Sequence, residues 1–470
     1  MYRFFIRLVQ TLISISVLFL ILALIMPFAS GFGIKSGYQR MLNQMRPAPG
    51  VIFTKLLDYH QGWFTSEATV QVTVRIPTTK NSIETLSYVA KQSIRHGPFI
   101  LTKALNNEWQ LYFAKAIMHG ETTHPNITQG STFLVVQWNN LVRLQIKAKL
   151  INIVQTRPYQ YVLYEPYATL TYSPNTKAIV GTVGFGGIQK LKSGKNIFLF
   201  NKVKYAFNVD RASGSWRSKH AFRAMQLTIF SKSAPLFFSD IILHLHSEDK
   251  GDISTLGIII FIDELAGGES KIGPVEARLT ASNIDSTALY ALINSVAHKA
   301  SLPAKNSTAV TFSEKLRQII GKGLQLDLSQ LNIGTGNGTM SASGALHIPT
   351  QATSPGIKTL ALESKANLNL LTPPRLTQEV LARLFIVTGI MPQGNLASAL
   401  NQASILLKMW IKQGVFIKDG QMLKLKLDLQ EGKALLNGRP IPMLRPTDLT
   451  QVHGPAQAES NQNDTNNEQW

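Results

Sequence analysis

Histidines and carboxylates are the side chains whose types and spacing in this sequence are closest to those of a reactive centre. His244 and His246 are two residues apart in a predicted strand, so both side chains point to one face. Such a pair can chelate a metal ion, and Glu248 and Asp249 follow after Ser247. Because the spacing locates no third protein ligand, we expect no metal and no cofactor at this pair, and metal binding is the alternative.

His60 and His96 are further candidates, either as acid–base groups or as ligands. The sequence fixes no acidic residue beside either one, so we expect packed or capping histidines. Patterns that carry a catalytic mechanism, such as His-Glu-x-x-His, Gly-x-Ser-x-Gly or a Walker loop, do not occur. We therefore predict a protein that is not an enzyme. The alternative is a hydrolase that uses His60, His96 or the His244 and His246 pair.

A group of glycines, Gly181, Gly184, Gly186 and Gly187, follows a predicted strand over residues 178–183. Phosphate-binding loops place such glycines directly before a helix, but no helical pattern begins here. We expect a hairpin turn at these glycines, with nucleotide binding as the alternative.

Composition excludes several kinds of site. The chain has no cysteine, so disulfides, thiolate metal ligands and thiol nucleophiles are absent. Its 47 Lys and Arg outnumber 27 Asp and Glu, and a net charge of +20 attracts polyanions. Basic and apolar residues alternate over 144–150 and 423–429, which predicts a sheet with one apolar face and one basic, solvated face. A dedicated polyanion site is the alternative, and nucleic acid is not expected because no array of stacking aromatic residues accompanies the charges.

The start of the chain has the composition of a membrane segment. No charged residue occurs from Leu8 to Ile34, and Arg3 and Arg7 precede this run. The run is long enough for the roughly 30 Å hydrocarbon core, whereas a cleavable signal peptide needs only about 7 to 15 apolar residues. We predict a cytoplasmic N-terminus over 1–7, a transmembrane signal anchor over 8–30 and a connector over 31–50. Cleavage near Ala29 is the alternative.

The remaining patterns predict a β-rich α+β protein, with a long curved antiparallel sheet and a few helices, mostly in the C-terminal half. We expect a β-rich part over 51–283, an α+β part over 284–450 and a disordered tail over 451–470. The predicted strands include 141–155 and 159–172, and Asp419-Gly420 predicts a hairpin turn. The predicted helices span 285–298, 313–320, 377–387 and 396–412.

Three groups of residues resemble motifs of the YdgA-like bacterial family of unknown function. They are Tyr59, Gly62, Trp63, Phe64 and Ser66 before the first long strand; His96, Gly97 and Pro98 after the next; and Asn437, Gly438 and Pro440 near the end. The resemblance extends from about residue 5 to 445, and it implies an inner-membrane anchor, a body in the periplasm and no established activity. In architecture alone, the chain is similar to the AsmA-like proteins linked to lipid movement.

The types of these motif residues indicate structural roles in the fold. Gly62 permits a close approach of the backbone, and Gly97-Pro98 ends strand pairing. Trp63 and Phe64 are expected to anchor the sheet.

We therefore expect a non-enzymatic, membrane-anchored protein that binds or handles lipid or another envelope component. An apolar concave face of the sheet would hold an acyl chain. The alternative is a module for protein–protein assembly that uses the sheet edge or helices over 377–412, either to form a homo-oligomer or to hold an envelope protein.

Overall fold

The computed structural model describes the following residues: 35–36, 39, 52–79, 82–97, 99–103, 108–154, 159–212, 215–230, 235–267, 270–289, 291, 318–350, 364–387, 390, 395–430 and 433–441. The predicted N-terminus, span and tail lie outside these residues, as does most of the connector. No helix within them is long and apolar enough to cross a membrane.

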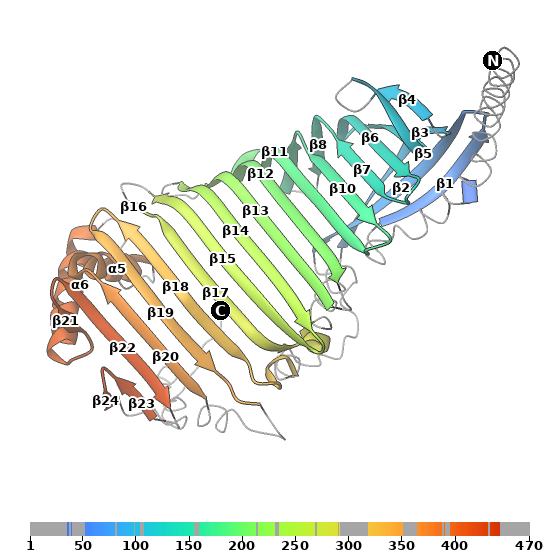
Figure 1. Ribbon diagram of the computed structural model, residues 1–470. Helices are drawn as coiled ribbons and strands as arrows, with labels where there is room; N and C mark the ends of the chain where they lie inside the picture. The colour runs from blue at the N-terminus through green and yellow to red at the C-terminus, as the bar shows by residue number, and fades with distance from the viewer. Residues whose placement is uncertain are drawn as a thin grey trace, which may run out of the picture.

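Strands make up most of the described chain (Figure 1), and the elements are grouped below by their order in the sequence. The first group is β1 (Ile52–Gln61), β2 (Thr65–Thr79), β3 (Ser82–His96), β4 (Phe99–Lys103), β5 (Trp109–His124), β6 (Ile127–Gln137), β7 (Val142–Lys147), β8 (Leu150–Val154), β9 (Tyr159–Tyr164) and β10 (Tyr167–Ser173). The second group is β11 (Ala178–Lys192), β12 (Lys195–Ala212), β13 (Ser215–Ile229), β14 (Leu236–Lys250), β15 (Ile253–Gly267), β16 (Ser270–Ile272) and β17 (Val275–Asp285). The third group is β18 (Gln325–Thr335), β19 (Gly338–His347), β20 (Lys365–Thr372), α5 (Pro374–Val387), α6 (Leu396–Lys412), β21 (Ile417–Asp419), β22 (Met422–Gln430), β23 (Lys433–Leu436) and β24 (Arg439–Ile441).

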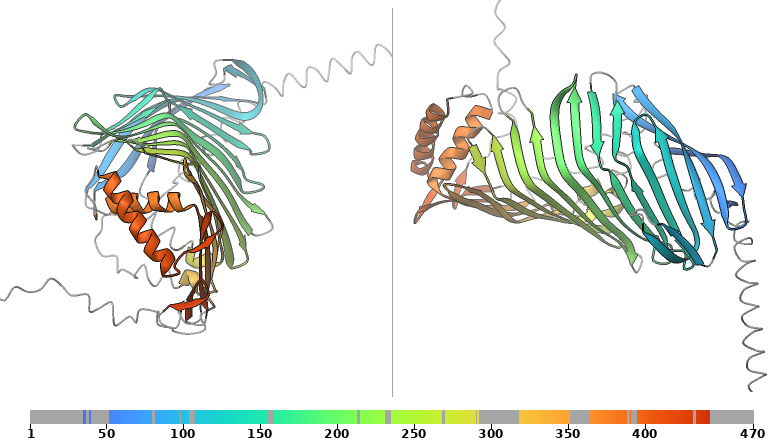
Figure 2. Two further views of the ribbon diagram at one scale, coloured as in Figure 1. Left: turned by 90° about the vertical axis from the view of Figure 1, so that its left-hand side faces the viewer. Right: turned by 90° about the horizontal axis from the view of Figure 1, so that it is seen from above.

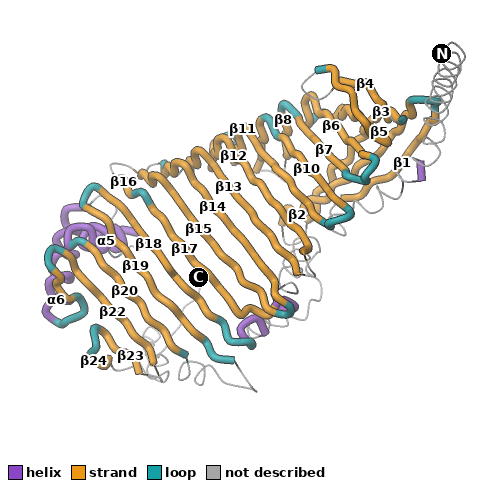
Figure 3. The backbone as a smooth tube through the Cα atoms, viewed as in Figure 1, coloured by secondary structure: helices purple, strands orange, loops and turns teal. Residues whose placement is uncertain are grey.

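The strands form one long antiparallel sheet in which neighbours in sequence are mostly neighbours in space (Figure 3). Pairing runs from β11 through β12, β13, β14 and β15 to β17, and on through β18, β19 and β20 to β22. β17 contains the boundary that we predicted between residues 283 and 284, and it pairs with β18 beyond that boundary. The β-rich class, the long antiparallel sheet and the few helices in the C-terminal half are therefore confirmed.

The prediction of two continuous strands is wrong. The segments 141–155 and 159–172 each divide in two, as β7 with β8 and β9 with β10. Glu165 has a φ of +46°, which interrupts the extended backbone between β9 and β10. Pro166 has no N–H to continue the ladder, and its carbonyl instead accepts the N–H of Ala148, between β7 and β8.

The C-terminal elements agree closely with their patterns. α6 has the predicted bounds, and its N-terminus is capped by Asn395, whose side chain accepts the Ser398 N–H. α5 starts at Pro374, because proline is well suited to the first turn of a helix. Gly420 has a φ of +60° in the turn between β21 and β22, as expected for an Asp-Gly hairpin.

Only the beginning of the helix predicted at 285–298 and the end of that at 313–320 lie within the described residues. Asp285 accepts the Ala288 N–H at 2.8 Å, which is the capping contact expected there.

The two faces of the sheet are distinguished by the packing of α6. Leu407 of α6 lies in a buried cluster with Phe416 and with Leu423 of β22, and Leu370 of β20 and Leu425 of β22 pack against that cluster. We call the sheet face that bears these residues the inner face and the opposite one the outer face. Figure 2 shows both helices on the concave side of the curved sheet. The inner face is therefore the concave side at this end.

Candidate functional site

The inner face continues across ten neighbouring strands, as the register between them shows. Residues directly opposite one another in an antiparallel sheet point to the same side, so the pairing of Leu370 with Leu425 can be followed back to β11. Every residue of this row is aliphatic or aromatic: Val183, Tyr205, Phe222, Leu243, Ile260, Ala277, Leu331, Ala342, Leu370 and Leu425. At about 4.8 Å between strands, the row extends about 43 Å.

Solvent still reaches most of this row. Ala342 is buried, and the other nine side chains are half-buried. The neighbouring row on the outer face contains Lys204, Arg223 and Lys424, all of them exposed. The same outer row also contains Ile242, Phe261 and Leu371, so the outer face is only in part basic. The inner row is aliphatic and aromatic throughout, and it is incompletely covered in its central part.

Aromatic rings gather on the inner face along β12. The ring of Tyr205 lies 5.7 Å from that of Phe207 between centroids. Farther along the strand, Phe200 lies 6.5 Å from Phe222 and 5.6 Å from Phe198. We call these five residues the aromatic track. Ten residues of extended chain span about 33 Å, so the track runs along one strand and across the sheet.

Two lysines adjoin one end of the aromatic track. Lys190 of β11 is directly opposite Phe198, and its Nζ lies 5.2 Å from the ring centroid of Tyr161 and 4.9 Å from that of Tyr159. The Nζ of Lys192 lies 5.6 Å from the Tyr159 ring. Cation–π contacts hold both charges over aromatic faces. The apolar track therefore ends at a cationic group that suits an anion.

A histidine lies beside the other end of the track. The Oη of Tyr205 and Nδ1 of His220 are 2.7 Å apart. Burial lowers the pKa of His220 and raises the pKa of Tyr205, so both groups are neutral near pH 7. The Oη and Nδ1 atoms then share one hydrogen bond between neutral groups, and this end of the track carries no charge.

The aromatic track was not anticipated, although its signal is visible in the sequence. Aromatic residues at i and i+2, as in Phe198 with Phe200 and Tyr205 with Phe207, point to one side of a strand. What the sequence does not contain is the register that aligns them with Phe222.

The predicted hairpin turn at the glycines is wrong, because all four glycines lie inside β11. A Cβ on Gly181 would lie 2.4 Å from the ring of Phe207, and one on Gly184 would lie 2.3 Å from the ring of Tyr167. These glycines accept aromatic rings across the strand pair, and no helix follows them to bind a phosphate.

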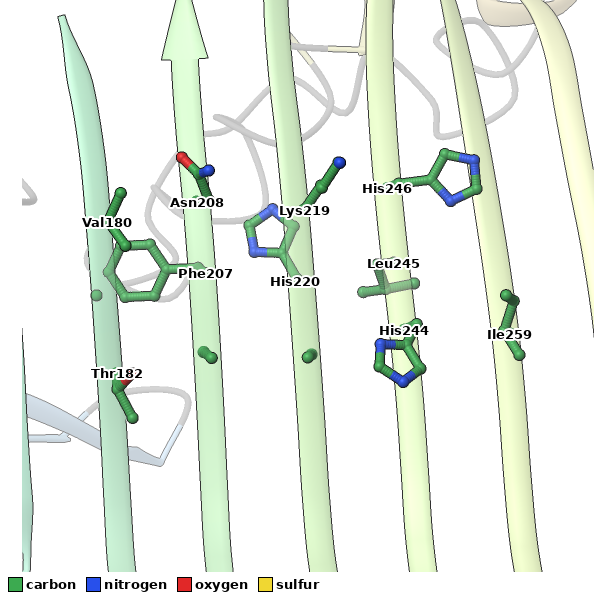
Figure 4. Close-up of a pocket in the computed structure, with 13 residues that line it drawn as sticks. Val180, Thr182, Phe207, Asn208, Lys219, His220, His244, Leu245, His246 and Ile259 are labelled. Atoms are coloured by element: carbon green, nitrogen blue, oxygen red, sulfur yellow. The ribbon is translucent and has the colours of Figure 1, made fainter.

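The histidine pair of β14 lies at a hollow of about 520 Å³ over β11 to β15 (Figure 4). His244 belongs to an outer-face row with Ala206 and Ala221, whose short side chains leave the hollow between neighbouring strands. The ring of His246 covers Gly257, where a Cβ would lie 1.8 Å from it. Both histidines thus share one face, as their spacing predicted.

The carboxylates after this pair have other partners. Glu248 forms an ion pair with Arg217 at 3.5 Å, and Asp249 accepts the Ser254 hydroxyl at 2.7 Å. In the part of the chain that the structure describes, no three His, Asp or Glu side chains are grouped as a metal site would require.

His96 is a packed histidine. Its Nε2 lies 3.1 Å from the Oγ of Ser66, and the two residues are 2% and 0% exposed. Its backbone N–H donates to the carbonyl of Phe64 at 3.0 Å, which ties the end of β3 to the β1–β2 turn. A serine and histidine buried to this extent are out of reach of a substrate.

His60 differs from expectation, because an acid does lie beside it. Its Nε2 is 2.8 Å from the Oδ2 of Asp58, and both side chains are largely exposed on β1. Both residues precede the β1–β2 turn, where extended backbone brings positions two apart to the same side.

The remaining residues of the first motif shape the turn. A Cβ on Gly62 would lie 2.3 Å from the carbonyl oxygen of Thr65, which explains the glycine. Trp63 and Phe64 do not anchor the sheet: each is 49% exposed, because they occupy the turn after Tyr59 and beyond the end of the sheet. β3 ends before Gly97, whose φ is +139°, and Pro98 lies outside the described residues.

The C-terminal motif is a structural junction. Asn437 and Gly438 have φ of +50° and +79° in the turn between β23 and β24, which contains Pro440. The Asn437 side chain accepts the Lys426 N–H and donates to the carbonyls of residues 414 and 415, at 2.7 to 2.9 Å. One amide therefore joins the end of α6 to the last strands.

Comparison with known proteins agrees with the motifs. One family model, described as bacterial protein of unknown function (DUF945), matches residues 9–443. No curated protein and no solved structure matches the chain.

Proposed function

Because this chain belongs to the DUF945 family of bacterial proteins of unknown function, we propose its function from the geometry of its sheet: it binds acyl chains of envelope lipids on the inner face. The observation that carries this proposal is the row of ten aliphatic and aromatic side chains across β11 to β22, nine of which are half-buried. A soluble ligand with polar groups would leave these groups unpaired against such a surface, whereas an acyl chain needs no hydrogen bonds.

The aromatic track gives the lipid an orientation. Acyl carbons would lie against Phe198, Phe200 and Phe222, and an anionic headgroup would lie at Lys190 and Lys192. The neutral Tyr205–His220 pair at the opposite end offers no charge to a headgroup. Phosphate at the lysine end and hydrocarbon along the track match the two parts of a phospholipid.

We propose no catalytic step. The nearest approach to a nucleophile and base, Ser66 with His96, is buried, and the exposed His60–Asp58 pair lies on β1 at the edge of the sheet. These placements support a binding function over hydrolysis.

The proposal includes a location. A signal anchor over residues 8–30 would hold the sheet beside the bacterial inner membrane, on the periplasmic side. It is supported by the uncharged run from Leu8 to Ile34 and by the arginines before it.

Assembly with a protein is the second candidate, favoured by α6. Ile405 and Met409 lie one turn apart on this helix and are 62% and 43% exposed. An apolar pair at this spacing fits the groove of a partner helix.

Two neighbouring residues of β14 test the proposal. Leu243 belongs to the inner row and Ile242 to the outer one, and both are half-buried. The full chain and its Leu243→Glu and Ile242→Glu variants are purified from membranes in mild detergent, and bound lipid is counted by mass spectrometry. We expect about one phospholipid or more per chain, retained by Ile242→Glu and lost from Leu243→Glu. Lipid-free protein, or equal loss from both folded variants, would contradict the proposal.

A further inference from the structure

The hairpin of β4 and the first half of β5 folds over the outer face of the sheet. One side of this hairpin is buried: Ile100 clusters with Phe133 and Val135 of β6. Thr102 is also buried, with its Oγ1 3.0 Å from the Nε2 of His119. The hairpin is thus fixed to the sheet by its inward side chains.

The other side of the hairpin presents large apolar residues to solvent. Register pairs Phe99 with Phe113, Leu101 with Leu111 and Lys103 with Trp109, so all six side chains point the same way. The five apolar members, which we call the hairpin patch, are 54% to 67% exposed: Phe99, Leu101, Trp109, Leu111 and Phe113. A contiguous group of this size marks a surface that binds something.

Positive charge surrounds the hairpin patch. The Nζ of Lys103 lies 5.6 Å from the ring centroid of Trp109, and Arg95 donates to the carbonyl of Leu101 at 2.8 Å. Lys115 lies 5.8 Å from the Trp138 ring, which is 6.1 Å from that of Phe113. Glu108 is the acidic residue next to Trp109 in sequence. Three cations against one carboxylate complement an anionic surface.

The residue types in and around the hairpin patch distinguish a protein partner from a lipid bilayer. Cores of protein–protein interfaces are depleted in lysine, whereas surfaces that enter a lipid headgroup region combine Trp, Phe and Leu with Lys. Lys103 is in register with the apolar side chains of the hairpin patch. We propose that the hairpin patch docks into the headgroup region of an anionic bilayer, independently of the lipid site proposed for the inner face.

The absence of cysteine allows a direct test in the full chain. Leu111→Cys introduces a single thiol, which is labelled with a polarity-sensitive fluorophore. The full chain is reconstituted into vesicles of phosphatidylethanolamine and phosphatidylglycerol that contain lipids brominated near the headgroup. Ile405→Cys on α6 is the matched control, because the two side chains are 67% and 62% exposed.

We expect brominated lipid to quench the fluorophore at 111 at least about threefold more strongly than that at 405. Lys103→Gln in the labelled chain should reduce the ratio of docked to free hairpin about fivefold, and neutral phosphatidylcholine vesicles should reduce it further.

Equal quenching at the two positions would overturn the proposal. So would shielding of position 111 that disappears when the protein is diluted at constant lipid, because the occupant would then be a second copy of the chain. Failure of lipid copurification would leave this result unaffected, since the labelled hairpin reports on the outer surface.

Discussion

Removing the hydroxyl of Ser66 should destabilise the N-terminal end of the sheet. The Ser66 Oγ contacts the Nε2 of His96 at 3.1 Å, and both residues are almost completely buried. In Ser66→Ala this nitrogen loses its hydroxyl partner inside an almost completely buried site. Losing a hydrogen-bond partner in a buried site costs about 1–3 kcal/mol, so the opening free energy of β2 and β3 should fall by that amount.

Ser87→Ala is the matched control. The Ser87 hydroxyl also has partners, accepting from Gln71 Nε2 at 3.0 Å and lying 3.2 Å from the Oγ1 of Thr73, but it is exposed on β3. Water can replace its contacts, so the change should stay within about 0.5 kcal/mol. Hydrogen exchange of amides in β2 and β3 is measured for both variants and the parent, and it gives the change in opening free energy caused by each substitution. Equal small effects would refute the assignment of Ser66 and His96 as a structural lock.

Three further predictions test separate parts of the structure. Gly181→Ala should lower stability by about 1–3 kcal/mol, because its Cβ would lie 2.4 Å from the Phe207 ring; Gly336→Ala, with nothing within 4 Å, should be tolerated in the same thermal unfolding experiment. Asn437→Ala removes three hydrogen bonds and should cost about 1–3 kcal/mol in urea unfolding, and an unchanged midpoint would count against the junction. Burial, then Arg95, lowers the pKa of His119 below its ordinary 6.5, so its contribution to stability is present above 6.5 and lost as pH falls through the lower folded value. The opening free energy of the β4 amides, obtained from hydrogen exchange after correction for the intrinsic exchange rate at each pH, should therefore fall on acidification, and a pH-independent opening free energy would contradict this.

Local signals predicted the elements well. The bounds of α6 follow from its helical period, and the turn at Gly420 follows from the Asp-Gly pair. The alternation of apolar and basic residues over 423–429 also correctly predicted that Leu423 and Leu425 lie on the apolar face, because successive side chains of a strand point to opposite faces.

The predictions that failed concern features that depend on contacts between residues far apart in the sequence. The glycines from Gly181 to Gly187 have the composition of a turn, and only rings from the neighbouring strands, Phe207 and Tyr167, show why β11 needs them. Trp63 and Phe64 were expected to anchor the sheet, but their position in the turn leaves each of them 49% exposed. The apolar row depends on the register of ten strands, and the sequence of one strand does not specify its register with the next.

Contact between a lipid and the inner face can be measured most directly by photo-crosslinking in living bacteria. A photoreactive residue replaces Phe222 on the inner row or Arg223 on the outer row, which are adjacent in β13. After irradiation, mass spectrometry identifies what has been joined to each position. The account predicts phospholipid adducts at 222 and few or none at 223. Protein adducts at 222, or equal lipid labelling at both positions, would contradict it.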